Sequence, residues 1–289
     1  MRQKIIRHSL RGTTFIVITI IIFFSLDSTI SKYYNKVQAV SSARTIAVQH
    51  MRMMGTTKWV PSVTWYVSAK SDRTDDYIKG LIYKGIPYSQ NNGGSTLEQW
   101  SHFSSRLKSI LYPYSDVYSC AVSAGISYSA PEEFGNDCAK AVFQSWQKAG
   151  SSVPVSGVST ASMLSAIKTP SNSMVKVGQY LTNGSDTLYM TDSQSEKDAL
   201  MKAYSLLQPG DCLFYRYNGS GHAIMVTSVN VSTKQVAFVD QIGSGSATGG
   251  KPAGWRLDET KSTWRVSNMT FSNLYASHYV PVTTTFSGW

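Results

Sequence analysis

Residues 212–240 read CLFYRYNGSGHAIMVTSVNVSTKQVAFVD and contain three short runs that are rich in aromatic and β-branched residues. The runs cover residues 212–217, 222–229 and 235–240, and an Asn-Gly pair and a Ser-Thr-Lys segment separate them. Both separators are typical of tight turns between antiparallel strands. This stretch therefore predicts an antiparallel meander of three strands.

Helical patterns come before the meander along the chain. Apolar residues recur at helical spacing over residues 72–83, 97–111 and 195–207, and a further helix is expected from Cys138 to a stop at Gly150. Residues 113–137 and 241–250 are expected to be loops, and residues 278–282 a last strand. Helices followed by strands favour an α+β fold in which a helix packs on an antiparallel sheet.

The composition excludes several classes of protein. Of the 289 residues, 42% are hydrophobic and 12% aromatic, which is enough for a sizeable core. With 3 Cys and 5 scattered His, a four-cysteine zinc site is excluded, and we expect neither a metal nor another cofactor. From residue 40 on, 21 basic residues face 16 acidic ones without a basic run. This charge does not predict nucleic-acid binding, and it suits an anionic cell-wall polymer.

Residues 1–39 are predicted to be a signal peptide or an N-terminal membrane anchor. A basic stretch over residues 1–11 precedes an apolar run of 14 residues, 13–26, which is shorter than the roughly 20 residues of a spanning helix. Val37 and Ala39 form a small-x-small cleavage motif unusually far from this run, so removal and retention both stay open. We expect a secreted or cell-envelope protein whose leader, if retained, contacts the membrane. Residues 40–70 are expected to be a spacer.

Cys138 and His222 have positions suited to catalysis. Cys138 immediately precedes an apolar-periodic helix, where backbone N–H groups and the helix dipole favour a thiolate. A buried small residue is an equally good interpretation of this cysteine alone. His222 opens a strand after a Gly-Ser-Gly loop, from which an imidazole can reach a thiol. A single histidine at a strand edge is more often an ordinary surface or core residue.

Four blocks of the chain resemble, in order, the NlpC/P60 and CHAP cysteine peptidases. They are YKGIPY at 83–88, NDC at 136–138, QPGDCLFY at 208–215 and GHAIMV at 221–226. The family patterns are G-x-P-Y, D-C-S-G, P-G-D-L-x-F-F and H-V-G-I-Y, and the resemblance spans about residues 72–242. It implies a papain-like fold, with the nucleophile on a helix that packs on an antiparallel sheet. The catalytic domain would cover residues 71–289, with inserted loops and a C-terminal extension.

The resemblance also implies roles for single residues. Cys138 would be the nucleophile, His222 its general base, and the N–H of Cys138 part of an oxyanion hole. The third member of the triad would follow on the next strand. Asp240 is preferred and Gln241 is the alternative, because adjacent strand residues face opposite sides and the register is not known. An ordinary solvated carboxylate is the other interpretation of Asp240.

Tyr88 and Asp137 match positions that line the substrate cleft of the family. Core packing is the alternative role for Tyr88, and helix capping is the alternative for Asp137. The residues after the nucleophile depart from the family, because Ala139 and Lys140 replace Ser-Gly. The Pro-Gly-Asp segment at 209–211 is interpreted as a structural turn.

The implied function is an exported cysteine hydrolase that cleaves an amide bond in the peptide part of bacterial peptidoglycan, as a cell-wall endopeptidase or amidase. Its partner would be the stem peptide of the wall. One alternative is a non-catalytic wall-binding or adhesion protein on the same fold, and another is a cysteine peptidase that acts on protein. Cys212 is expected to be buried rather than reactive, although outside the cytosol a disulfide with Cys120 is conceivable.

Overall fold

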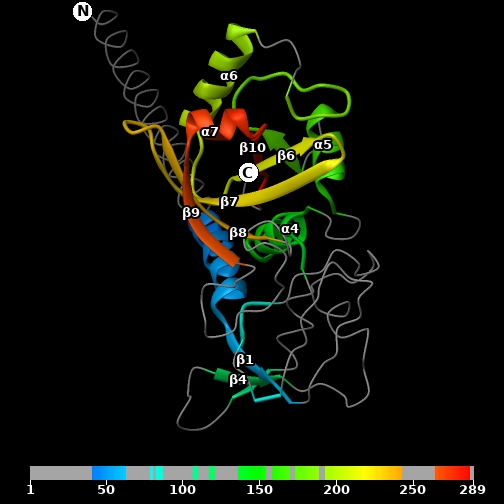
Figure 1. Cartoon of the computed structure of the whole chain (residues 1–289), viewed down its shortest axis with the longest axis vertical. Coiled ribbons are helices and arrows are strands. Elements are labelled where there is room, and N and C mark those ends of the chain that lie inside the picture. Colours follow the sequence, from blue (N-terminus) through cyan, green and yellow to red (C-terminus); the bar gives the residue numbers. More distant parts are fainter. Residues whose placement is uncertain are drawn as a thin grey trace, which may run out of the picture. The chain divides into compact units, whose positions relative to one another are not determined.

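The computed structural model describes residues 41–62, 79–80, 83–86, 107–109, 117–120, 136–153, 158–169, 173–188, 193–242 and 264–286. From Ala43 on, these residues belong to one compact unit, Ala43–Ser287. The fold is α+β, with a large antiparallel sheet, a small mixed sheet and several helices (Figure 1). The coarse fold class expected from the sequence is therefore confirmed.

Each neighbouring pair in the large sheet is antiparallel, and the six strands follow the order β5-β10-β6-β7-β8-β9. The strands are β5 (Met174–Lys176), β6 (Cys212–Tyr217), β7 (Ser220–Asn230), β8 (Gln235–Gln241), β9 (Trp264–Thr270) and β10 (Val280–Thr284). Strands β6, β7 and β8 confirm the predicted meander. The predicted last strand corresponds to β10, which begins two residues later.

A two-residue turn joins β6 to β7 and determines where His222 lies. Asn218 and Gly219 have φ values of 47° and 78°. A type I′ hairpin needs this left-handed backbone at both central positions, and Asn-Gly is its preferred pair. Tyr217 and Ser220 close the hairpin, so that His222 pairs with Tyr215 across the two strands.

Five helices are described around the sheet. They are the helix over residues 41–56, α4 (Cys138–Lys148), α5 (Thr160–Lys168), α6 (Gln194–Ser205) and α7 (Phe271–Ala276). Helix α4 contacts β7 and β8, α5 contacts β5, β6 and β7, and α6 contacts α7 and β10. Helices α4 and α6 confirm two predictions, whereas α5 and α7, like β5 and β9, were not predicted.

The helix over residues 41–56 is part of the hydrophobic core. Ala43, Ala47, Met51 and Met54 repeat at helical spacing on its buried face. The helix touches α4 where the Nδ1 atom of His50 lies 3.3 Å from the Oγ atom of Ser145. Residues that the sequence assigned to a spacer therefore contribute a helix, and then strand β1, to the packed molecule.

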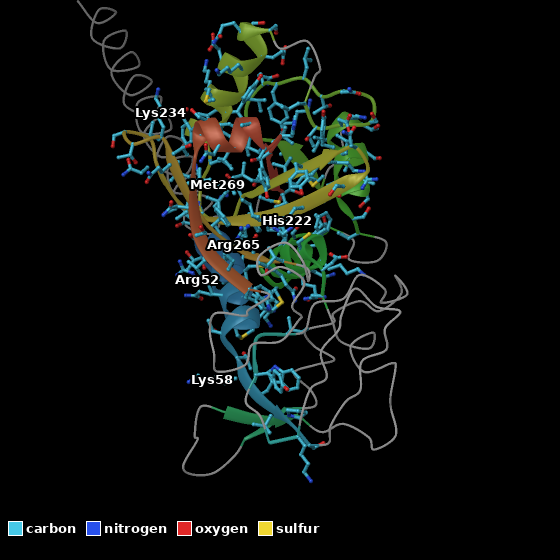
Figure 2. The ribbon with its side chains drawn as sticks, in the orientation of Figure 1. Arg52, Lys58, His222, Lys234, Arg265 and Met269 are labelled. Carbon is cyan, nitrogen blue, oxygen red and sulfur yellow. The ribbon has the colours of Figure 1, made fainter. Side chains whose placement is uncertain are left out.

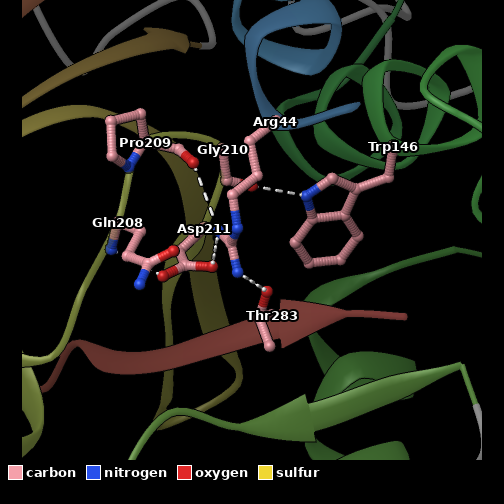
Figure 3. Close-up of polar contacts among 7 residues, drawn as sticks. All are labelled: Arg44, Trp146, Gln208, Pro209, Gly210, Asp211 and Thr283. Atoms are coloured by element: carbon pink, nitrogen blue, oxygen red, sulfur yellow. Dashed lines mark hydrogen bonds and ion pairs between the residues drawn. The ribbon is translucent and has the colours of Figure 1, made fainter. Parts of the chain in front are cut away.

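Arg44, on this helix, binds the turn at residues 209–211 (Figure 3). Its Nη1 atom donates to Asp211 Oδ1 at 2.5 Å and to the Pro209 carbonyl at 3.2 Å, while Nη2 donates to Thr283 Oγ1 at 3.2 Å. Gly210 has a φ of 87°, and a Cβ atom there would lie 3.2 Å from the Arg44 backbone. Glycine avoids both problems. The predicted structural turn thus anchors the start of the helix.

The small sheet has four strands in the order β2-β1-β4-β3. They are β1 (Lys58–Pro61), β2 (Tyr83–Lys84), β3 (Leu107–Ser109) and β4 (Val117–Cys120). Strands β1 and β4 are parallel, and the other pairs are antiparallel. Trp59 pairs with Tyr83, and the centroids of their buried rings are 5.4 Å apart.

Three predictions for this region are wrong. Where a helix was expected over 72–83, the structure has a turn at residues 79–80 and strand β2 from Tyr83. Strand β3 lies within the helix expected over 97–111, and strand β4 lies within the loop expected over 113–137. Pairing with strands that are distant in the sequence outweighs a short helical pattern. The remainder of both expected helices, and residues 243–250, lie outside the described residues.

The expected leader, residues 1–39, also lies outside the described residues. Among the segments that the structure describes, no helix combines the length and the apolar character needed to cross a bilayer.

Candidate active site

Cys138 is the first residue of α4, directly after the N-cap residue Asp137. Asp137 Oδ1 accepts a hydrogen bond from the backbone N–H of Lys140 at 2.8 Å. The first N–H groups of a helix have no acceptor within the helix, and this cap satisfies that of Lys140. The capping bond leaves the N–H of Cys138 to other acceptors.

Asp137 was expected to bind substrate or to cap the helix, and it occupies the capping position. Burial raises the pKa of Asp137, although its hydrogen bonds to the Lys140 and Ala139 backbone and the charges of Lys140 and His222 oppose the rise. The Nζ atom of Lys140 lies 3.9 Å from Asp137 Oδ2. Lys140 thus places a cation beside the cap.

A buried pair of amides supports the chain just before Cys138. Asn136 Nδ2 donates to Gln144 Oε1 at 2.9 Å, and Gln144 Nε2 donates back to Asn136 Oδ1 at 3.0 Å. Asn136 is fully buried and Gln144 is 5% exposed. This double hydrogen bond fixes the approach of the chain to Cys138. It was not predicted, because nothing in the local sequence pattern pairs these two residues.

His222 contacts both other members of the predicted triad. Its Nε2 atom lies 2.6 Å from Asp240 Oδ2, and the Cys138 side chain is near enough to raise the pKa of the imidazole. Burial favours the neutral imidazole, but the negative charge of a Cys138 thiolate and the hydrogen bond to Asp240 outweigh burial. Together they raise the pKa of His222 to about 10. Cys138, His222 and Asp240 are thus brought together in one row.

The strand register explains why Asp240 and not Gln241 faces the imidazole. Met225 on β7 pairs with Val239 on β8. Because side chains alternate along a strand, His222 and Asp240 then share one face, while Gln241 shares the other face with Val239. The Gln241 side chain donates to the carbonyl of Ile86 at 2.9 Å.

Arg265 is a member of the site that sequence reasoning missed. It lies on β9 directly across from Asp240, and Figure 2 labels it near His222. Its Nε donates to Asp240 Oδ1 at 3.1 Å and its Nη2 donates to Asp240 Oδ2 at 2.6 Å. Strand β9 was not predicted, so the sequence offered no signal that would place this arginine at the site.

Two tyrosines lie beside the triad. Tyr215 is the cross-strand partner of His222. The Tyr279 ring packs edge to face against the Tyr215 ring, with centroids 5.1 Å apart. Tyr279 is 3% exposed, and burial, followed by the negative charge of Asp240, raises its pKa. The aromatic rings therefore form an apolar wall next to the charged groups.

The remaining sequence expectations concern Tyr88, the other cysteines and metals. Tyr88 lies outside the described residues. Cys212 is fully buried, as expected, and burial raises its pKa strongly. It is a free thiol, so the conceivable disulfide with Cys120 is not formed. Within the described ranges, no three His, Cys, Asp or Glu side chains gather as a group that could hold a metal ion.

Comparison of the chain with protein-family models, with curated proteins and with solved structures finds no match.

Proposed function

We propose that this protein is a cysteine hydrolase that cleaves an amide bond, with Cys138 as nucleophile, His222 as acid and base, and Asp240 as the third member of the triad. The observation that carries the proposal is the row Cys138–His222–Asp240, in which Cys138 begins a helix, His222 Nε2 lies 2.6 Å from Asp240 Oδ2, and Cys138 raises the pKa of the imidazole. A thiol in hydrogen-bond reach of an imidazole, with the imidazole oriented by a third group, is the general signature of an activated nucleophile.

In the proposed first half-reaction, the Cys138 sulfur attacks the carbonyl carbon of the amide and forms a tetrahedral oxyanion. The N–H of Cys138 at the start of α4 donates to this oxygen. The C–N bond then breaks as the His222 imidazolium gives its proton to the leaving amine. The product is a thioester on Cys138 and a neutral imidazole.

In the second half-reaction, the neutral imidazole of His222 takes a proton from a water molecule. The water oxygen attacks the thioester carbonyl, and the C–S bond breaks to release a carboxylic acid. Asp240 keeps Nε2 of the imidazole occupied during both steps, so that the other ring nitrogen stays turned to the sulfur. The thiolate and the imidazolium are restored at the end of the cycle.

The fold that we propose for this chemistry is papain-like, of the NlpC/P60 type. Two features support the proposal beside the sequence blocks. The nucleophile opens a helix that packs on β7 and β8 of an antiparallel sheet, and those two strands carry His222 and Asp240. The Pro-Gly-Asp block at residues 209–211 forms the turn that leads into β6, next to the histidine strand.

The proposed substrate is the peptide part of bacterial peptidoglycan, and the proposed location is secreted or attached to the cell envelope. The resemblance to wall peptidases and the basic, apolar leader support both. A net charge of +5 from residue 40 on suits contact with anionic wall polymers.

Mass spectrometry of purified peptidoglycan tests the proposal. Wall material is incubated with the full-length protein and with its Cys138→Ala variant under the same conditions. New peptide fragments in the wild-type sample alone are expected, and their ends identify the bond that is cut.

Other outcomes separate the competing functions. Fragments of equal yield with the Cys138→Ala variant would exclude Cys138 as nucleophile. If neither protein releases fragments but both sediment with wall material, a non-catalytic wall-binding protein on this fold is favoured. If the protein releases peptides from a denatured protein substrate but leaves peptidoglycan uncut, a peptidase that acts on protein is favoured.

A further inference from the structure

Arg265 holds the Asp240 carboxylate by both of its oxygens. The Nε and Nη2 atoms of the guanidinium meet Oδ1 at 3.1 Å and Oδ2 at 2.6 Å, and the His222 Nε2 atom lies 2.6 Å from the same Oδ2. Two parallel hydrogen bonds fix the plane of a carboxylate, which a single contact does not do. The oxygen that faces the imidazole is therefore determined by the arginine.

We propose that Arg265 is the positioning residue of this site: its planar guanidinium fixes the Asp240 carboxylate, and through it holds the His222 imidazole turned to Cys138. This inference deepens the proposed function and rests on it.

The burial of Asp240 makes a partner of this kind necessary. Its side chain is 0% exposed, whereas the side chains of His222 and Arg265 are 14% and 36% exposed. A buried carboxylate is costly unless its oxygens are hydrogen-bonded. His222 lies against Oδ2 alone, and Arg265 supplies donors to both oxygens.

Arg265 is itself held in place by the sheet. It pairs directly with Asp240 in the register of β8 and β9, and its guanidinium lies 5.2 Å from the centre of the Phe238 ring. Phe238 precedes Asp240 by two residues, so both side chains are on the face of β8 that Arg265 occupies. Although burial opposes the charge, the hydrogen bond to Asp240 and its negative charge raise the pKa of Arg265.

An ordinary surface ion pair would not have this effect. Exposed pairs contribute little because water and salt screen both partners. Here the acceptor is buried and one of its oxygens is shared with His222, so a change in Arg265 reaches the imidazole directly. Lysine would supply the charge but not the planar pair of donors. The Arg265→Lys variant therefore separates geometry from charge.

The test measures the alkylation of Cys138 by iodoacetamide between pH 5 and 11 in the full-length protein, with mass spectrometry of the peptide that contains Cys138. Arg265→Lys and Arg265→Met are compared with wild type. Arg52→Lys and Arg52→Met are the matched controls, because Arg52 is exposed on the helix over residues 41–56. Circular dichroism reports whether each variant is folded, and the wall-cleavage assay is run in parallel.

In the wild-type protein, the rate at which iodoacetamide alkylates Cys138 is expected to change at alkaline pH, where the His222 imidazolium loses its proton. In Arg265→Lys this change is expected at lower pH, because the imidazole proton has lost its fixed acceptor. Turnover is expected to fall on the order of 10²-fold, as for a misplaced catalytic group. A merely structural role would lower the melting temperature and leave the alkylation profile unchanged. If the Arg265→Lys variant is folded and has the alkylation profile and the turnover of wild type, the proposal is overturned.

His222→Ala distinguishes failure of this inference from failure of the proposed function. If the profile depends on His222 and Arg265 but wall is not cleaved, Arg265 has its positioning role and the proposed substrate is wrong. If His222→Ala leaves the alkylation of Cys138 unchanged, the triad itself fails and the role of Arg265 fails with it. If Arg265→Met does not fold, the Arg265→Lys profile decides the outcome.

Discussion

The His222 imidazole interacts with two groups of the site. Asp240 Oδ2 lies 2.6 Å from Nε2, and the interaction with Cys138 is the largest influence that raises the pKa of the ring. Burial alone would favour the neutral ring, because a charge is costly in a protein interior. These two interactions more than compensate for burial. We therefore expect His222 to be an imidazolium at neutral pH, which is the state that the proposed mechanism requires.

This expectation can be measured by NMR of the ¹⁵N-labelled imidazole. The pKa of His222 is raised from 6.5 to about 10, so the ring keeps both protons through neutral pH and loses one only as the pH rises through about 10. The charge of Cys138 is the largest favourable contribution. Cys138→Ala is therefore expected to move the titration midpoint down toward 6.5.

The matched control for this titration is Cys212→Ala. Cys212 is a second buried free thiol, on the strand next to that of His222, and it does not contribute to the pKa of His222. Its removal should leave the midpoint near that of wild type. A wild-type midpoint close to 6.5, with no response to Cys138→Ala, would contradict the thiolate and imidazolium pair.

Single residues of the site were predictable to different degrees. Cys138 and His222 had local signals, namely a helix start and a strand start. The choice of Asp240 over Gln241 needed the register of β7 and β8, which sequence alternation does not supply. Arg265 lies across from Asp240 on a strand that follows a long segment, and its sequence neighbours show no pattern that connects it to the site.

At the level of elements, the start of α4 is held from two sides. The Asp137 cap satisfies a backbone N–H group, and the pair of Asn136 and Gln144 ties the preceding residue to the helix two turns further on. Both amides are buried, so each satisfies donors and acceptors that would otherwise be unpaired. Cys138 therefore begins a helix whose start is rigidly determined.

A double-mutant cycle tests this amide pair. Asn136→Ala and Gln144→Ala should each lower the free energy of unfolding by about 1–3 kcal/mol, because each leaves a buried amide without its partner. The double variant should lose less than the sum of both, with a coupling on the order of 1 kcal/mol. Urea unfolding measures these values.

Gln147→Ala provides the control on the same helix, because Gln147 is less buried than Gln144. It should change the free energy of unfolding by less than about 0.5 kcal/mol. Strict additivity of Asn136→Ala and Gln144→Ala would show that the two amides act independently.

The elements that were predicted have local causes, but α5 was missed although a capping box of Ser159 and Ser162 begins it. Helices α4 and α6 have capping residues and helical periodicity, and β6, β7 and β8 have β-branched runs with turns between them. Strand β2, in contrast, exists because Tyr83 pairs with Trp59, 24 positions earlier. A short amphipathic pattern over 72–83 predicted helix, and the distant pairing determined strand instead.

At the level of the whole molecule, the helix over residues 41–56 joins the core through buried apolar residues and one buried ion pair. Arg44 and Asp211 have side chains that are 11% and 2% exposed. Asp211 also accepts the backbone N–H of Gln208 at 2.7 Å, and the Trp146 indole of α4 donates to Gly210 at 2.7 Å. The helix over residues 41–56, the turn at residues 209–211 and α4 therefore meet at one place.

Arg44→Met is expected to destabilise the whole unit, because it leaves the buried Asp211 carboxylate without its cation. Breaking a buried ion pair from one side costs about 3–5 kcal/mol, a large share of the roughly 5–15 kcal/mol that holds a typical protein folded. Adding Asp211→Asn removes the uncompensated charge and should recover part of this loss. Arg52→Met, at an exposed position of the same helix, should cost less than about 0.5 kcal/mol. Chemical unfolding measures all four proteins, and an Arg44→Met variant as stable as wild type would mean that the N-terminal helix is held by its apolar face alone.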